Sequence, residues 1–85
     1  MGEKRIIIIG RDSCDFCLHA EDFCRAAELQ YVFLNYENRQ EILQDYKDFY
    51  NQKTVPIVLS NDLDTGLTEK VGGYSDLLEY TKTFI

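Results

Sequence analysis

The sequence predicts an α/β domain in which a four-stranded mixed sheet is flanked by three helices. Short apolar runs rich in β-branched residues alternate with segments in which apolar residues recur every three or four positions, and a turn separates the last two runs. The 85 residues suffice for one small domain, 1–85, and leave no room for a second core. With 45% hydrophobic residues and only one proline, the chain is expected to fold.

The first half of the chain is predicted to form a strand, a helix and a second strand. The run 5–10 is continuously apolar and dominated by isoleucine, which is typical of a strand covered on both faces. Apolar residues then recur at helical spacing, and Ser13 is a suitable N-cap for this helix. The helical stripe consists of Cys17, Ala20, Cys24 and Ala27, with Phe23 beside them. The run 31–34 is the second strand, and the crossover length favours parallel pairing.

A second helix and a third strand are predicted next. Asn38 and Glu41 have the spacing of a capping box at the start of a helix. The apolar stripe of this helix consists of Ile42, Tyr46, Phe49 and Tyr50. The run 55–59 is the third strand, with Pro56 near its start, where a residue without an N–H is tolerated.

A hairpin and a last helix complete the predicted order. The segment 61–66 has the composition of a turn, and 67–71 returns as a shorter, more polar strand at a sheet edge. Gly72-Gly73 ends this strand, and Ser75 is a suitable cap for the last helix. The apolar side of the last helix consists of Leu77, Leu78, Tyr80 and Phe84.

Charge and length exclude several function classes. Nine Lys and Arg residues against fifteen Asp and Glu give a net charge of -6, which argues against nucleic acid and anionic membranes as partners. The N-terminal apolar run is too short for a signal peptide or a membrane span. We therefore expect a cytoplasmic protein, in which cysteines stay reduced unless they bind metal or act in catalysis.

The strongest functional signal is Cys14-Asp15-Phe16-Cys17, at the junction of the first strand and the first helix. A C-x-x-C at this place indicates a dithiol redox site, because its spacing lets two sulfurs on one helical turn approach bonding distance. The unpaired N–H groups and the positive dipole end of the helix stabilise a thiolate, which is the form that attacks a disulfide. We predict Cys14 as the nucleophile and Cys17, on the buried stripe, as the resolving thiol.

Charges near Cys14 act in opposite directions. Asp12 and Asp15 oppose formation of a thiolate, whereas Arg11 favours it, and the sequence leaves their balance open. Asp15 is nevertheless well placed for the helix itself, because an acidic residue in the first turn complements the helix dipole.

Two alternative roles for the cysteines are considered. All three could be small buried hydrophobic residues, and this role suits Cys24 better than the C-x-x-C pair. A zinc site could recruit Cys14, Cys17, His19 and Cys24. However, the chain has no second C-x-x-C or His pair, and His19 projects from a different side of the helix than Cys17 and Cys24. We expect no metal site, with Cys24 in the core and His19 facing solvent.

Four features in matching order make the chain resemble a glutaredoxin, a thioredoxin-fold oxidoreductase. They are Arg11 before the first cysteine, Cys14-Asp15-Phe16-Cys17, Thr54-Val55-Pro56, and Gly72-Gly73-Tyr74-Ser75-Asp76. Together they span nearly the whole chain and are far more specific than C-x-x-C alone. The resemblance implies a thioredoxin-like fold and an enzyme that reduces protein disulfides and glutathione mixed disulfides, with glutathione as co-substrate and no metal.

The resemblance also implies a glutathione-binding groove. Its residues are Arg11, Phe16, Thr54, Val55, Pro56, Tyr74, Ser75 and Asp76. Arg11, together with Lys53, would meet the glycine carboxylate, and Phe16 would form a wall. The Val55 main chain would pair with the cysteinyl backbone of glutathione. The helix start at Tyr74-Ser75-Asp76 would hold the γ-glutamyl end, although Asp76 is also suited to a purely structural role as an acidic residue in the first helical turn.

The base rate and the resemblance disagree about the peptide bond before Pro56. Because only about 5 to 6% of X-Pro bonds in folded proteins are cis, composition alone predicts a trans bond. The resemblance implies a cis Val55–Pro56 bond that packs beside the dithiol.

The motif departs from the family's common Cys-Pro-Tyr-Cys, with Asp15 for proline and Phe16 for tyrosine. Relatives without that proline include iron–sulfur carriers, so one alternative is a dimer in which Cys14 and glutathione bind a [2Fe–2S] cluster. Another is a hydrogen donor recycled by thioredoxin reductase. The expected partners of the preferred enzyme, a monomer, are disulfide-containing or glutathionylated proteins, with ribonucleotide reductase as a family-level candidate.

Overall fold

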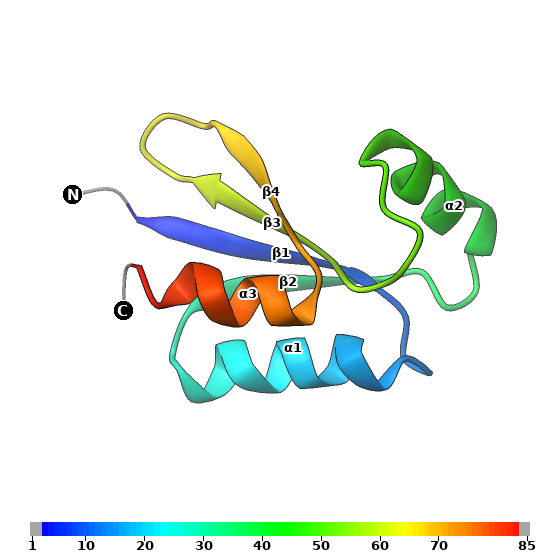
Figure 1. Ribbon diagram of the computed structural model, residues 1–85, viewed down its shortest axis with the longest axis horizontal. Coiled ribbons are helices and arrows are strands. Elements are labelled where there is room, and N and C mark those ends of the chain that lie inside the picture. The colour runs from blue at the N-terminus through cyan, green and yellow to red at the C-terminus, as the bar shows by residue number, and fades with distance from the viewer. Residues whose placement is uncertain (1–2, 84–85) are drawn as a thin grey trace.

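The computed structural model describes residues 3–83 and contains strands and helices in the predicted order (Figure 1). The elements are β1 (Lys4–Gly10), α1 (Asp15–Ala26), β2 (Gln30–Asn35), α2 (Gln40–Phe49), β3 (Ile57–Asp62), β4 (Thr68–Gly72) and α3 (Tyr74–Thr81). The predicted class, a small α/β domain with a four-stranded mixed sheet and three helices, is confirmed. In the part of the chain that the structure describes, every helix is too short or too polar to cross a membrane.

The strands are ordered β2-β1-β3-β4 in a single sheet. β1 pairs with β2 in parallel and with β3 in antiparallel orientation, so that Ile8 lies between Phe33 and Val58. This central position explains the unbroken apolar sequence of β1, because both faces of the strand are covered. Ile6, Ile8 and Ile9 are accordingly at most 1% exposed.

Side chains that alternate along β1 contribute to two separate apolar clusters. The first cluster lies between the sheet and the pair α1 and α3, which cover the same face (Figure 1). Its buried members are Ile6, Ile8, Ala20, Cys24, Val58 and Leu77. The second cluster lies on the opposite face, where Leu43 of α2 packs with Ile9, Ile57 and Leu59.

The topology brings three chain segments together at one end of the sheet. Figure 1 shows the starts of α1 and α3 and the entry into β3 at this end, whereas the β3–β4 hairpin lies at the other. The motifs around Cys14, Pro56 and Gly73 therefore meet in space, although they are far apart in the sequence.

The predicted cap of α1 is wrong by one residue. Cys14, and not Ser13, is the N-cap, and its sulfur accepts the N–H of Cys17 at 3.2 Å. The N–H of Ser13 instead donates to the Glu37 carboxylate at 2.8 Å. This bond draws Ser13 toward the β2–α2 connection, which a local capping pattern does not reveal.

The predicted caps of α2 and α3 are also wrong. α2 follows Arg39, without a side-chain cap, so Asn38 does not start the helix. α3 begins after Gly73, whose N–H donates to the Asp76 carboxylate at 2.9 Å, so Ser75 lies within the first turn. Because polar residues are frequent at all these positions, residue type alone does not choose among adjacent caps.

The buried side of α2 also differs from the prediction. Leu43 is its one fully buried residue, whereas Phe49, which was assigned to the apolar stripe, is 80% exposed. α2 covers only part of its sheet face (Figure 1), so its stripe is incompletely buried. In α3, Leu77 is buried as predicted, and Phe84 lies outside the described residues.

The third strand is shifted from 55–59 to Ile57–Asp62, so Val55 and Pro56 precede it. The pairing with β1 continues through Arg5 with Asn61 and Lys4 with Asp62, which places the start of the predicted turn within the strand. β4 correspondingly runs over Thr68–Gly72 and not 67–71.

Candidate functional site

Cys14 lies at the start of α1 with its sulfur turned toward two backbone groups. The sulfur accepts the Cys17 N–H at 3.2 Å, and the thiol donates to the Val55 carbonyl at 3.8 Å. Its backbone is extended and the residue is half-buried. A sulfur that caps a helix N-terminus is held where the N–H groups and the dipole favour negative charge. This geometry suits Cys14 as a nucleophile.

Cys17 lies one turn further along α1 and is completely buried. Burial is the main cause that raises the pKa of the Cys17 thiol to about 12, and the hydrogen bond with Cys14 raises it further. A Cβ atom on Gly10 would lie 2.3 Å from the Cys17 sulfur, so the absence of a side chain at Gly10 makes room for this thiol. The two cysteines therefore differ in environment: Cys14 is accessible, whereas Cys17 is kept protonated.

The peptide bond between Val55 and Pro56 is cis. The trans bond predicted from the base rate is therefore wrong, and the cis bond implied by the resemblance is what the structure contains. Pro56 is buried, and the Val55 carbonyl faces the Cys14 sulfur.

A groove of about 310 Å³ lies beside this pair of backbone segments. We call it the thiol groove, and it is lined by Phe16, Thr54, Val55, Pro56, Gly73, Tyr74, Ser75 and Asp76. Every residue predicted to contact glutathione lines it, except Arg11 and Lys53. Gly73 also lines the groove, although the sequence did not predict it as a glutathione-binding residue. The feature that could have indicated it is the Gly72-Gly73 pair, which lies between β4 and α3.

Arg11 and Lys53 are not among the residues that line the thiol groove. The Arg11 guanidinium reaches the Ser13 hydroxyl at 3.5 Å, and its carbonyl accepts the Cys14 N–H at 3.3 Å. Lys53 is exposed and lines a separate depression beside α2. The predicted pair of cations is therefore not brought together in this groove.

Asp76 has a structural role that can be seen directly. Its carboxylate accepts the Gly73 N–H at the start of α3, which is the one half of a capping box that is possible when the N-cap residue is glycine. At Gly72 the φ angle is +128°, and a Cβ atom there would lie 2.3 Å from the Asp76 carboxylate. The structure thus shows the capping role that was the alternative for Asp76, while the residue also lines the thiol groove.

Glu37 is a residue near the site that the sequence analysis did not identify. Its carboxylate accepts the N–H of Ser13, which holds the pKa of Glu37 below its usual range. The contact joins the β1–α1 loop to the β2–α2 loop, so no local sequence signal could have indicated it.

Cys24 and His19 lie where the sequence placed them. Cys24 is completely buried in the cluster between α1, α3 and the sheet, and burial raises its pKa to about 11. His19 is exposed, with its ring near those of Phe16 and Tyr74. Among residues 3–83, no group of three His, Cys, Asp or Glu side chains is arranged to hold a metal ion.

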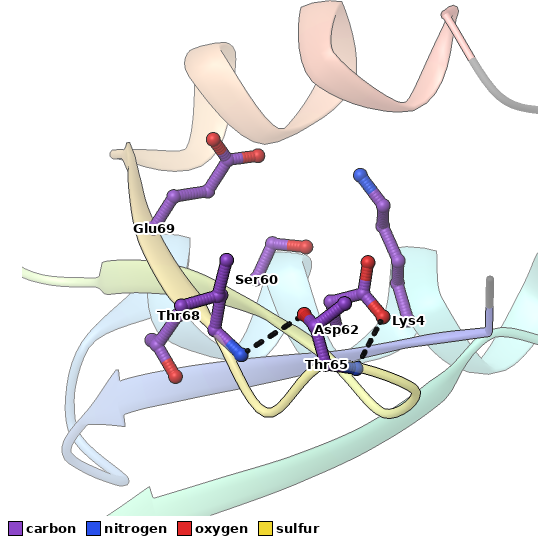
Figure 2. Close-up of a pocket in the computed structure, with 7 residues that line it drawn as sticks. Lys4, Ser60, Asp62, Thr65, Thr68 and Glu69 are labelled. Atoms are coloured by element: carbon purple, nitrogen blue, oxygen red, sulfur yellow. Dashed lines mark hydrogen bonds between the residues drawn. The ribbon is translucent and has the colours of Figure 1, made fainter.

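A second pocket, of about 390 Å³, lies toward the hairpin and contains no cysteine (Figure 2). Figure 2 shows Lys4 and Glu69 pointing toward α3 above Ser60. These polar groups bind one another through the Tyr80 hydroxyl, which lies 3.0 Å from the Lys4 ammonium and 2.9 Å from the Glu69 carboxylate. The polar side chains at this pocket thus already have hydrogen-bond partners within the protein. We therefore place the candidate site at the thiol groove and not at this pocket.

Comparison with known proteins does not assign a family. No protein-family model matches the chain, and no curated protein sequence matches it. The function is therefore argued from the thiols, the groove beside them and the motifs in the sequence.

Proposed function

We propose that the protein is a glutathione-dependent thiol–disulfide oxidoreductase of the glutaredoxin type, built on a thioredoxin-like fold. The observation that carries this proposal is the position of the Cys14 sulfur. It caps α1, faces the Val55 carbonyl and lies at a chain segment that adjoins the thiol groove. These features supply an accessible sulfur at a helix N-terminus and a place for the molecule that it attacks.

The reaction is an exchange in which sulfur–sulfur bonds form and break in equal number. The Cys14 thiolate attacks the glutathione sulfur of a mixed disulfide, which releases the substrate as a thiolate and leaves glutathione bonded to Cys14. A free glutathione thiolate then attacks the glutathione sulfur of this adduct. Oxidised glutathione leaves, and Cys14 returns as a thiolate. The net reaction consumes one free glutathione and converts one glutathione mixed disulfide into the substrate thiol and oxidised glutathione.

The groove suits the glutathione half of this intermediate. The Val55 main chain adjoins the cis Pro56 and can pair with the cysteinyl backbone of the tripeptide. The N–H groups of the first turn of α3 can receive its γ-glutamyl carboxylate, while Asp76 accepts from its ammonium. Phe16 also lines the groove and can form a wall for the ligand.

Cys17 has a different role, because its buried thiol stays protonated at neutral pH. When Cys14 is bonded to a protein substrate, Cys17 can attack the Cys14 sulfur, form a Cys14–Cys17 disulfide and release the substrate. Cys17 must lose its proton before this attack. Reduction of a glutathione mixed disulfide needs Cys14 alone.

The test is the reduction of a small glutathione mixed disulfide by the purified protein, with glutathione as reductant. Cys14→Ser is expected to abolish turnover, whereas Cys17→Ser retains most of it, and Cys24→Ser serves as the matched control for a lost thiol. Unchanged turnover by Cys14→Ser would remove Cys14 from the proposed role.

A second candidate is motivated by Asp15, which stands where a proline would stiffen the helix start. Of the described cysteines, Cys14 is not fully buried, whereas Cys17 and Cys24 are, so one chain offers one accessible thiolate to a [2Fe–2S] cluster. Such a cluster would require glutathione and a second chain to complete its ligands. Anaerobic reconstitution that leaves a colourless monomer contradicts this alternative.

A further inference from the structure

Three aromatic rings form an exposed surface that continues outward from the thiol groove. We call Phe16, His19 and Tyr74 the aromatic rim. Their ring centroids lie 5.9 to 6.1 Å from one another. Phe16 is 59% exposed, and His19 is exposed without lining the groove. Phe16 and His19 belong to α1 and Tyr74 to α3, whose starts lie at the same end of the molecule (Figure 1).

The groove itself does not require this extension. Phe16 and Tyr74 line the groove, but His19 lies about one turn further along α1 and does not line it. The rim is therefore available to another part of the substrate, namely the protein segment whose cysteine sulfur leaves when Cys14 attacks the glutathione sulfur.

The charges beside the rim indicate what that part is. Asp12 and Asp15 flank Cys14 in the chain and are both exposed. Within residues 3–83, neither carboxylate lies within ion-pair distance of a cation, whereas Asp22, one turn beyond His19, is paired with Arg25 at 3.2 Å. The nearby cations are Arg11, which is half-buried against Ser13, and Lys53, which lies beside α2.

We propose that the aromatic rim, with Asp12 and Asp15, receives a cationic segment next to the disulfide of a protein substrate. This inference rests on the proposed oxidoreductase function and names its substrate class. A guanidinium group stacks on exposed aromatic rings and pairs with carboxylates. Asp15 lies four residues before His19 on α1, which places the two residues next to each other on one face of the helix. An acidic segment would meet two exposed carboxylates that have no ion-pair partner within residues 3–83, and it would be repelled.

The test compares glutathionylated peptides that differ only in the residues flanking the cysteine: two arginines, two glutamates or two leucines. We expect kcat/KM for the arginine peptide to exceed that for the glutamate peptide at least about fivefold at low ionic strength, and the ratio to fall in high salt. A combined Asp12→Asn and Asp15→Asn variant should bring the ratio close to one. The ratio cancels any change in the reactivity of Cys14, because both peptides are attacked by the same sulfur.

The matched control carries Glu28→Gln and Asp64→Asn, which change the net charge equally but lie after α1 and in the hairpin, away from Cys14. It should keep the preference. The inference would be overturned if this control lost the preference for the arginine peptide to the same extent. It would also be overturned if the wild type showed no preference, or turned over the glutamate or leucine peptide faster than the arginine peptide. A small neutral mixed disulfide, tested in parallel, reports separately on the proposed function: if it is reduced while the peptides are not distinguished, only the inference fails.

Discussion

At the scale of single residues, the account depends on the difference between two thiols that are three positions apart. Cys14 caps a helix and is half-buried, whereas Cys17 is buried and Cys24 lies in the core. Helical spacing predicted that Cys17 and Cys24 are buried, because residues that share a helix face share a burial state, but the sequence placed the helix cap at Ser13 and not at Cys14. It could not predict that Gly10 makes room for Cys17, since this contact joins a strand to a helix.

This difference predicts the order in which the thiols are alkylated. Brief treatment of the reduced protein with iodoacetamide at pH 8 should modify Cys14 first, because burial raises the pKa to about 12 for Cys17 and about 11 for Cys24. Peptide mass mapping after increasing times measures the order. Earlier modification of Cys17 or Cys24 would contradict the assignment, and a denatured sample, in which all three react, is the control.

The close approach at Gly10 predicts that a side chain there is destabilising. Gly10→Ala would place a Cβ atom 2.3 Å from the Cys17 sulfur and 3.1 Å from its Cβ atom. We expect the free energy of unfolding to fall by about 1 to 3 kcal/mol, as for other overpacked cores. Urea denaturation measures this loss. Gly73→Ala, where the new Cβ atom meets nothing closer than 3.9 Å, is the control, and equal losses in both variants would refute the explanation.

At the scale of helices and strands, the sequence predicted which elements form but not where each begins. Apolar patterns identified β1 and α1, because burial requires those patterns. The caps Ser13, Asn38 and Ser75 were wrong, because Glu37 draws Ser13 away from α1 and Asp76 closes the start of α3 on Gly73. Both corrections involve contacts that a list of preferred residue types does not contain.

The Tyr80 hydroxyl links α3 to side chains of three strands, Lys4, Ser60 and Glu69, so we predict that its removal lowers stability. The Tyr80 hydroxyl lies 2.8 Å from the hydroxyl of Ser60, which is 2% exposed, and 2.9 Å from the Glu69 carboxylate. Having one proton, Tyr80 donates to Glu69 and accepts from Ser60. Tyr80→Phe should lower the free energy of unfolding by about 1 to 3 kcal/mol, since the buried Ser60 loses its partner.

The free energies of unfolding of Tyr80→Phe and of the control Tyr50→Phe are measured by chemical denaturation and compared. The Tyr50 hydroxyl has no hydrogen bond within residues 3–83, so its removal should change stability little. If both variants lose the same amount, the contact of Tyr80 with Ser60 does not stabilise the fold.

At the scale of the whole molecule, the raised pKa values of the buried thiols couple folding to pH. Cys17 and Cys24 have ordinary thiol pKa values when unfolded, so above about pH 9 the unfolded state loses protons that the folded state retains. Below this pH the two thiols do not reduce the free energy of unfolding. As the pH rises from about 9 toward 12, the free energy of unfolding declines. The decline for Cys17 is at most about 4 kcal/mol, since a tenfold change in proton affinity corresponds to about 1.4 kcal/mol.

Denaturation of the reduced protein at several pH values between 9 and 12 measures this decline. The difference between wild type and Cys17→Ala isolates one thiol from the tyrosines and lysines that titrate in the same range. A difference that stays constant with pH would show that Cys17 does not contribute to the decline.

The assembly of the thiol groove was predictable only in part. Its lining comes from three segments, represented by Phe16, Pro56 and Tyr74, which the topology brings to one end of the sheet. Hydrophobic pattern and spacing indicated the elements, but the resemblance grouped these segments into one site. Arg11 and Lys53 were expected to join them and do not line the groove, because loop conformation, which the sequence pattern does not determine, sets their positions.

The most direct test of the central claim is to locate the glutathione adduct. Reduced Cys17→Ser is mixed with oxidised glutathione, so that an adduct on Cys14 cannot be displaced by its neighbour, and the product is mapped by peptide mass spectrometry. We expect one glutathione per chain, disulfide-bonded to Cys14, and its release on adding reduced glutathione. An adduct on Cys24, or an unmodified Cys14, would contradict the central claim.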